Sequence, residues 1–283
     1  MTSLAFTKMH GHGNDFVVIA DAGAGTRYGV LAVKLCDRHR GVGADGLIVI
    51  CPSDVADCRM RIFNSDGSEA QMCGNGIRCV GKYVHDNGLV ATLSPMIDTM
   101  SGLRHLTLYQ DADGTVGRVA VDMGVSEVCT ALCRPGVWQI GGKGVSLTTS
   151  SGTYSLIPVS VGNPHGVIFV DNAATAPVDT LGPLLECHEA WPEKANIGFV
   201  SVEGSGVLIQ RTWERGVGET EACGTGACAA AVAAVATGRS TFPVDVVQTG
   251  GTLHIDRNNA TGHIVMTGGA KTVFSGVIDI SLL

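Results

Sequence analysis

Apolar and polar residues follow one another along the chain in short runs that predict many strands and few helices. Runs of four to eight apolar or alternating residues, bounded by glycine and aspartate, are typical of strands. Helical patterns are predicted for residues 74–87 and 224–237, with a shorter one at 178–185. The predicted strands lie at residues 16–20, 46–51, 59–64, 104–109, 117–123, 154–161, 167–170, 197–202, 207–213, 244–248, 252–256, 264–267 and 272–280.

The two longer predicted helices differ in how apolar they are. Residues 227–236 are alanine, valine and cysteine throughout, and a helix that is apolar all round is normally enclosed by other structure. We therefore expect this helix to run through the middle of a curved sheet. The helix at 74–87 carries Arg78, Lys82 and Tyr83, so we expect it to reach the surface on one side.

Two stretches of the chain are versions of one another. Residues 61–76 and residues 211–226 share an arginine, a glutamate and a Cys-Gly-x-Gly segment at a constant offset, since 211 − 61 = 150 and 223 − 73 = 150. Cys73 and Cys223 are the matched side chains that can react, and each directly precedes a predicted helix. The repeat predicts two similar domains with one reactive thiol in each.

A helix N-terminus offers unpaired N–H groups and a partial positive charge, which hold anions and ease the ionisation of an adjacent thiol. Glycines on both sides of Asn75 and Thr225 let a ligand approach the backbone closely. Two such thiols facing one α-carbon could remove its proton on one side and return a proton on the other, which inverts the centre. This scheme needs no cofactor, and residues 11–15 fit neither of the usual phosphate-binding glycine patterns.

The chain resembles the diaminopimelate epimerase family along almost its entire length. Six segments carry the resemblance, in order: residues 9–16, 63–69, 73–76, 162–165, 195–196, and 213–216 continuing through 223–226. The resemblance implies an enzyme that interconverts LL- and meso-diaminopimelate without pyridoxal phosphate, for lysine and cell-wall synthesis. It also implies a homodimer with an α/β (α+β) fold of two pseudo-symmetric domains, each a curved, mostly antiparallel sheet or barrel around a central helix.

The resemblance also assigns domains and site residues. The first domain would span residues 1–123, with residues 271–283 returning to it, and the second would span residues 124–270. Cys73 and Cys223 would be the catalytic acid/base pair, with His165 and Glu214 tuning the thiols. Substrate would be bound by Asn14, Asn64, Gly74, Asn75, Asn163, Asn196, Glu214, Arg215, Gly224 and Thr225. Some family members have glutamine where Gly46 stands, so a side-chain contact made there by those members cannot exist here.

Composition narrows the function further. A formal net charge of −7 and a sequence pI near 5.7 give no electrostatic reason to bind nucleic acid. The start of the chain lacks a secretory pattern, and no apolar run is long enough for a membrane span, so we expect a cytoplasmic protein. Ten cysteines should then be reduced, and we interpret Cys36, Cys51, Cys58 and Cys187 as small buried apolar residues. No histidine and cysteine spacing indicates a metal site.

Two alternatives stay open at this point. A racemase of another amino acid, such as histidine, would keep the fold and the chemistry, whereas a non-catalytic amino-acid-binding protein would use the cleft without the thiols. Arg215 and the asparagines Asn64, Asn163 and Asn196 could bind a second amino-acid-like group at the far end of a substrate. Diaminopimelate has such a group. We interpret the repeated Arg61 and Arg211 as packing or surface residues.

Overall fold

The computed structural model describes all residues except 1–2, 24, 135–138, 142–143 and 280–283. Its contacts divide the chain into two compact units, one formed by Met1–Asp122 with Thr267–Leu283 and the other by Met123–Met266. The sequence places the corresponding boundaries after residues 123 and 270.

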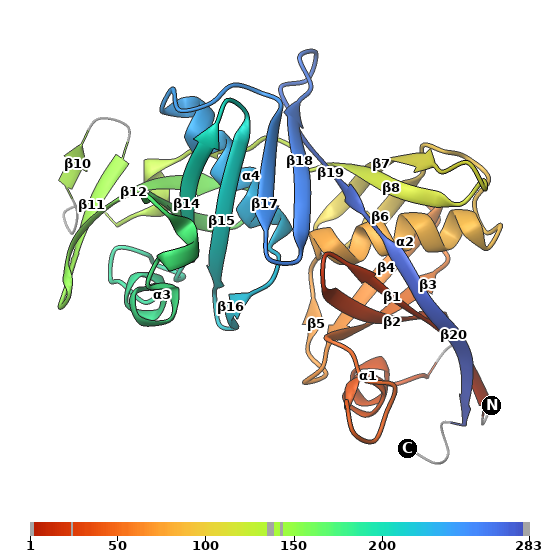
Figure 1. Ribbon diagram of the computed structural model, residues 1–283. Helices are drawn as coiled ribbons and strands as arrows, with labels where there is room; N and C mark the ends of the chain where they lie inside the picture. The colour runs from red at the N-terminus through yellow and green to blue at the C-terminus, as the bar shows by residue number, and fades with distance from the viewer. Residues whose placement is uncertain (1–2, 24, 135–138, 142–143, 280–283) are drawn as a thin grey trace. The chain divides into compact units, whose positions relative to one another are not determined.

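The first unit is a mostly antiparallel sheet that wraps around one helix, α2 (Gly74–Asp86) (Figure 1). Its strands are β1 (Ser3–Gly11), β2 (Asn14–Ala20), β3 (Gly46–Cys51), β4 (Cys58–Asn64), β5 (Glu69–Ala70), β6 (Met96–Thr99), β7 (Gly102–Gln110), β8 (Val116–Asp122) and β20 (Lys271–Asp279). Strands β2 and β3 pair in parallel, as do β4 and β6, and the pairs β1–β2, β1–β20, β3–β4, β4–β5, β6–β7 and β7–β8 are antiparallel. A second helix, α1 (Tyr28–Cys36), packs against β3 and β4.

The second unit repeats this plan around α4 (Gly224–Ala236). Its strands are β9 (Glu127–Val128), β10 (Gln139–Gly141), β11 (Gly144–Thr149), β12 (Gly152–Ser160), β13 (Pro164–Phe169), β14 (Asn196–Gly204), β15 (Val207–Glu214), β16 (Gly218–Thr220), β17 (Val244–Gln248) and β18 (Gly251–Arg257). A further strand, β19 (Ile264–Gly269), begins in this unit and ends in the first. Its helices are α3 (Val178–Glu186), α4 and the short 3-10 helices η1 (Thr130–Leu132) and η2 (Ala173–Thr175).

Four strand pairings of the first unit recur in the second. The parallel pairs β13–β14 and β15–β17 correspond to β2–β3 and β4–β6, and the antiparallel pairs β14–β15 and β15–β16 correspond to β3–β4 and β4–β5. Helix α4 contacts strands on several sides, from β12 to β18. The predicted α/β class, with two pseudo-symmetric halves that each enclose a helix, is confirmed.

Helix α4 is buried along most of its length, as its apolar sequence predicts. The expectation for α2 is wrong in one respect, because Arg78 is fully buried and Lys82 is 8% exposed. Lys82 can be buried because its ammonium donates to Asp86 Oδ2 and to the Val116 carbonyl, both at 2.7 Å. Helix α2 reaches the surface only through its last turn, at Tyr83, His85 and Asp86.

Most predicted strands agree with the structure within two or three residues, and β3 and β17 have the predicted bounds. The last residue of the strand predicted at 272–280 lies outside the described residues.

All ten cysteines are free thiols. The interpretation of Cys187 as buried is wrong: it follows the last residue of α3 and is exposed, whereas Cys36 and Cys58 are buried and Cys51 is half-buried.

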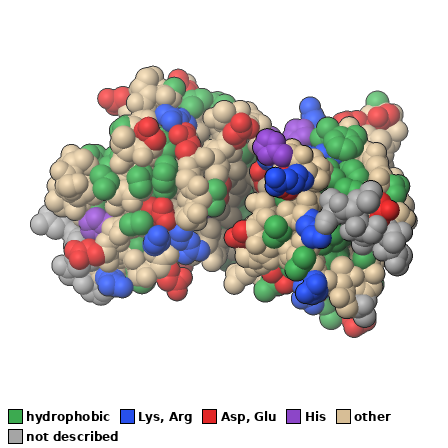
Figure 2. Space-filling model, turned by 90° about the horizontal axis from the view of Figure 1, so that it is seen from below, with side chains coloured by type: hydrophobic (Ala, Val, Ile, Leu, Met, Phe, Trp, Pro, Cys, Tyr) green, Lys and Arg blue, Asp and Glu red, His purple; other side chains and the backbone are tan. Residues whose placement is uncertain are grey.

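On the face shown in Figure 2, acidic and basic side chains lie interspersed among polar and apolar ones. Within the part of the chain that the structure describes, no helix combines the length and the apolar character needed to cross a membrane.

Candidate active site

Cys73 is the N-cap residue of α2. Its backbone is extended (φ −131°, ψ 122°), and the helix begins at the next residue, Gly74. The thiol accepts a hydrogen bond from the Gly76 amide (Sγ to N 3.5 Å) and donates to Asn14 Oδ1 (3.4 Å). Asn14 is oriented in turn by its amide group, which donates to Asp45 Oδ2 at 2.7 Å. The half-buried thiol thus lies beside the first turn of the helix, where the field of the helix is most positive.

The repeated arginines hold the segments that lead to the cysteines. Arg61 on β4 forms a two-pronged ion pair with Glu69 on β5 (2.7 and 2.9 Å). Arg211 on β15 forms the same pair with Glu219 on β16 (2.6 and 2.9 Å). Both are bidentate guanidinium–carboxylate pairs, which fix orientation as well as distance. The role of these arginines is therefore structural, in agreement with their interpretation as packing residues.

Arg78 lies under the first turn of α2 and is fully buried. Its guanidinium donates to the Gly74 carbonyl (3.0 Å), the Gly269 carbonyl (3.2 Å) and Asn75 Oδ1 (2.9 Å), and lies 2.9 Å from Nδ1 of His12. Burial, together with Arg78 and His10, lowers the pKa of His12 to about 4. The neutral imidazole therefore accepts from Arg78 at physiological pH.

Close packing leaves no room for side chains at two glycines of the first unit. A Cβ on Gly11 would lie 3.0 Å from the Asn75 carbonyl oxygen, and a Cβ on Gly46 would lie 2.8 Å from that of Phe63. At Gly46, where the sequence resemblance implies glutamine in some family members, this backbone would have to shift to accept a side chain. Asn64, at the end of β4, is exposed and donates to Ser68 Oγ at 2.9 Å.

Cys223 has the same N-cap position on α4, with extended backbone (φ −122°, ψ 110°), but different partners. The thiol is buried and donates to Glu214 Oε2 at 3.2 Å, and Thr225 Oγ1 lies 3.7 Å from the sulfur. The other oxygen of Glu214 accepts from Thr220 Oγ1 at 2.6 Å. Burial, and then the adjacent Glu214 carboxylate, raises the pKa of Cys223 well above its ordinary value. This sulfur therefore carries its proton at neutral pH.

Two glutamines that the sequence did not single out support Cys223. Gln248 on β17 accepts from the Cys223 amide (3.0 Å) and donates to the Cys223 carbonyl (3.1 Å) and to Gln210 (2.8 Å). Gln210 on β15 donates to the Gly226 carbonyl at 3.0 Å. Both side chains are buried, and a buried amide pair with satisfied partners rigidifies what it contacts. The first turn of α4 is thus held by neutral amides where α2 is held by a guanidinium.

Four more predicted residues of the second unit, Asn163, His165, Asn196 and Arg215, take part in three hydrogen bonds. The side-chain oxygen Oδ1 of Asn196 accepts from the Arg215 backbone amide (3.0 Å), and its side-chain NH₂ donates to the Pro164 carbonyl (3.1 Å). His165 lies 3.0 Å from Asn163 Oδ1. Burial, with a smaller effect of Arg215, lowers the pKa of His165 to about 3, so its ring is neutral.

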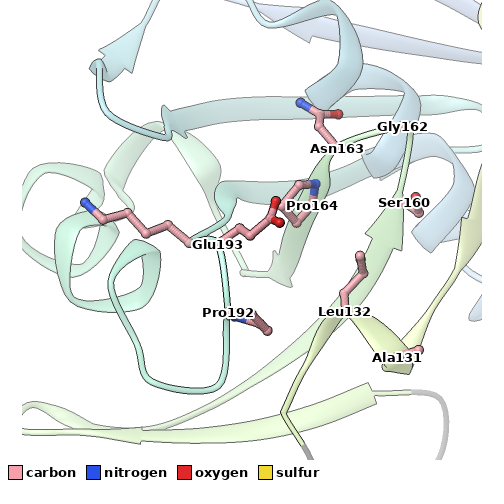
Figure 3. A pocket seen from close by; sticks show the side chains of 9 residues that line it. Ala131, Leu132, Ser160, Gly162, Asn163, Pro164, Pro192 and Glu193 are labelled. Atoms are coloured by element: carbon pink, nitrogen blue, oxygen red, sulfur yellow. The ribbon is translucent and has the colours of Figure 1, made fainter. Parts of the chain in front are cut away.

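A pocket of about 290 Å³ lies where β12 ends and β13 begins, and of the predicted site residues Asn163 lines it. Figure 3 shows the Glu193 carboxylate directed toward Pro164. The carbonyl of Glu193 accepts from the Arg215 guanidinium at 2.9 Å. The loop that forms one wall of this pocket therefore also orients the arginine.

A family model described as diaminopimelate epimerase matches residues 6–129 and 157–273. A diaminopimelate epimerase of Leptospira biflexa is 44% identical over 278 residues, which cover 97% of this chain and 99% of that protein. A diaminopimelate epimerase of Heliobacterium modesticaldum is 42% identical, with 98% of this chain and 100% of that protein covered.

Solved structures of more distant proteins share the fold. A probable proline racemase from Agrobacterium radiobacter superposes with a TM-score of 0.71 at 16% identity, with 96% of this chain and 92% of that chain covered. A phenazine biosynthesis protein of the PhzF family from Bacillus anthracis gives 0.70 at 18% identity, with 98% and 99% covered. At these identities the likeness concerns the fold.

The low pKa of His165 predicts a loss of stability in acid. Between pH 6.5 and about 3 the unfolded chain binds a proton that the native ring does not, so the free energy of unfolding falls as pH falls, by up to about 1.4 kcal/mol per pH unit for this group. Urea unfolding measured from pH 7 to 4.5 gives the free energy of unfolding as a function of pH. The slope of this dependence should be smaller in His165→Asn than in the wild type by the contribution of this one group. The exposed His39→Asn variant is the control, and equal slopes in wild type and His165→Asn would contradict the assignment.

The environment of Cys223 predicts slow alkylation that Glu214→Gln accelerates. Removing the neighbouring negative charge lowers the pKa of the thiol and raises the thiolate fraction, so we expect a severalfold higher rate of iodoacetamide labelling at pH 8. Peptide mapping by mass spectrometry measures this rate, with exposed Cys187 as the internal reference. An unchanged ratio of the two rates would show that the carboxylate does not act on the sulfur.

Proposed function

The chain belongs to the diaminopimelate epimerase family, and from this premise we propose that it converts LL-diaminopimelate to meso-diaminopimelate by inverting one α-carbon with two cysteines. It is an isomerase, and the reaction serves the biosynthesis of lysine and peptidoglycan precursors. The observation that carries the two-cysteine proposal is the duplicated N-cap: each unit presents one thiol at the mouth of one buried helix.

In the proposed reaction Cys73 and Cys223 act on opposite faces of the α-carbon. One sulfur, as thiolate, takes the α-proton; the electron pair is delocalised onto the carboxylate; the other sulfur then gives its proton to the carbon from the far side. The contact of Glu214 with Cys223 at 3.2 Å supports a role in exchanging the proton of that sulfur. The same sulfur can then act as acid in one direction and as base in the other.

We propose that helix N-termini bind the reacting carboxylate and that polar side chains bind the rest of the substrate. Backbone N–H groups at the start of a helix have no intrahelical acceptor, and those concerned here belong to Gly74, Asn75, Gly224 and Thr225. The far amino-acid end would be bound by Asn64, Asn163, Asn196, Glu214 and Arg215, with Asn14 lining the site. A guanidinium has five N–H donors, and the contact of Arg215 with Glu193 uses one nitrogen. The chemistry requires no cofactor.

We further propose that each compact unit is a domain and that two copies of the chain pair through β20. Lys271–Ser275 are exposed in succession, and because neighbouring strand residues point to opposite faces, both faces of this strand are uncovered. Val273, Phe274 and Val277 are 56%, 48% and 70% exposed. Apolar strand surfaces of this kind invite pairing with another chain. We place the protein in the cytoplasm, where thiols stay reduced.

Replacing either cysteine should abolish inversion without abolishing binding. We expect Cys73→Ser and Cys223→Ser each to lower kcat for LL-diaminopimelate by about 10² to 10⁴, the range typical of a lost acid or base. A coupled assay for meso-diaminopimelate measures kcat, and calorimetry measures binding, with Cys187→Ser as control. Full inversion by either variant would refute the two-base mechanism. If the enzyme exchanged the α-proton of histidine in deuterated water faster than that of diaminopimelate, the assignment of diaminopimelate as the substrate would be wrong.

A charge on the apolar face of β20 should prevent self-association. We expect Val277→Lys to sediment as a monomer under conditions in which the wild-type chain sediments as a dimer, because pairing would bury the ammonium. Val55→Lys, at a loop position that is 62% exposed, is the matched control and should keep the wild-type mass. A wild-type chain that is monomeric at micromolar concentration would contradict the proposal.

A further inference from the structure

Glu186, the last residue of α3, is a buried carboxylate with several donors around it. Its side chain is 7% exposed. Oε2 accepts from the Trp213 indole N–H at 2.8 Å, and Oε1 accepts from the Gly216 backbone N–H at 3.0 Å. The Lys194 ammonium lies 3.5 Å from Oε1 on the solvent side. The carboxylate therefore connects a helix, a strand and a turn through two directed hydrogen bonds.

The turn held by Glu186 joins β15 to β16 and contains Glu214 and Arg215. It is closed by a backbone hydrogen bond from Val217 N to Glu214 O at 3.0 Å, and Gly216 adopts φ +75°. Glu186 holds the Gly216 amide and Asn196 holds the Arg215 amide. Two consecutive amides of the turn are thus fixed by side chains from elsewhere in the unit, so the directions in which Glu214 and Arg215 leave the backbone depend on both.

Helix α3 comes close enough to β15 for this contact because of Gly182. A Cβ at that position would lie 2.6 Å from Cγ of Trp213, so the indole packs directly against the helix backbone. Trp213 is also paired with Ile197 and Glu219 in the sheet. The indole N–H therefore has a fixed direction, and Glu186 receives it from one side while receiving the Gly216 N–H from the other.

The first unit closes its matching turn without a carboxylate from its helix. The position equivalent to Glu186 is Cys36, since 186 − 150 = 36. There the turn after β4 is closed by Asp66, which accepts from the Ser68 amide (2.9 Å) and hydroxyl (2.6 Å), and a Cβ on Gly29 of α1 would lie 2.6 Å from the Gly67 carbonyl oxygen. The fold shared by the two units therefore does not require a glutamate at the end of this helix. Glu186 is a feature of the second unit.

We propose that Glu186 is a positioning residue that fixes the Glu214–Arg215 turn for catalysis and substrate binding. The inference rests on the proposed function, in which Glu214 exchanges the proton of Cys223 and Arg215 binds the far end of diaminopimelate. A carboxylate is the side chain that suits the position because it can accept on both oxygens. A glutamine would direct its NH₂ group at one of the two N–H donors and leave that donor unsatisfied.

The test is Glu186→Gln, alone and combined with Trp213→Phe. In the single variant we expect KM for LL-diaminopimelate to rise about tenfold or more, with a smaller change in kcat, because Arg215 loses its orientation. Iodoacetamide labelling of Cys223 should also become faster, because Glu214 moves away from the sulfur. In Trp213→Phe/Glu186→Gln the indole N–H is absent, so the single side-chain oxygen of the glutamine is free to accept from the Gly216 amide. KM and the rate of Cys223 labelling should therefore return close to the values of Trp213→Phe alone.

The matched control is Glu189→Gln, which removes the same charge from an exposed position three residues further along the chain. The thermal midpoint is recorded for every variant. A lowered midpoint in Glu186→Gln with KM and Cys223 labelling unchanged would show a purely structural role and overturn the inference, as would failure of the second substitution to rescue. Inactivity of the wild-type chain on diaminopimelate would instead refute the proposed function, while labelling still tests the turn.

Discussion

The proposed chemistry depends on a cysteine with an extended backbone that is fixed between a strand held by an ion pair and a buried helix, a constraint that occurs once in each unit. The strand is pinned by a bidentate pair, Arg61 with Glu69 and Arg211 with Glu219. Each pair orients the last short strand before the cysteine, and the helix that follows is enclosed by its sheet. The four residues between the glutamate of each pair and the start of the helix are therefore fixed at both ends. The sulfur consequently has little freedom to move away from the N-terminus of the helix.

The two units keep this constraint and differ in what surrounds the sulfur. Beneath α2 the buried Arg78 guanidinium adds positive charge close to the first turn, whereas beneath α4 the same place is held by the uncharged amides of Gln210 and Gln248. Glu214 adds a negative charge beside the second sulfur. This carboxylate, after burial, raises the pKa of the Cys223 thiol. The repeat thus conserves the N-cap position of the thiols, while the charged and polar groups around them differ.

Local patterns in the sequence predicted much of the fold, and the exceptions have physical reasons. Apolar runs in the sequence predicted the bounds of β3 and β17, and the duplicated motif predicted that both cysteines precede a helix. Helix α1 was missed because its N-cap, Arg27, makes no side-chain capping bond, so no start signal precedes it. Glu186 and Gln248 were missed because each contacts residues 25 or more positions away. Such partners become visible only when packing brings distant strands and helices together.

The asymmetry of the units suits an epimerase better than a racemase. A racemase interconverts mirror-image molecules, so its two thiols face equivalent tasks. LL- and meso-diaminopimelate are not mirror images, because the second stereocentre is unchanged by the reaction, and an enzyme that distinguishes the two ends must recognise that far end in one fixed orientation. The turn bearing Arg215 is held by the side chains of Glu186 and Asn196, whereas the matching turn of the first unit bears Ser65, whose amide donates to the Asp45 backbone carbonyl. An unequal pair of half-sites is therefore what this substrate requires.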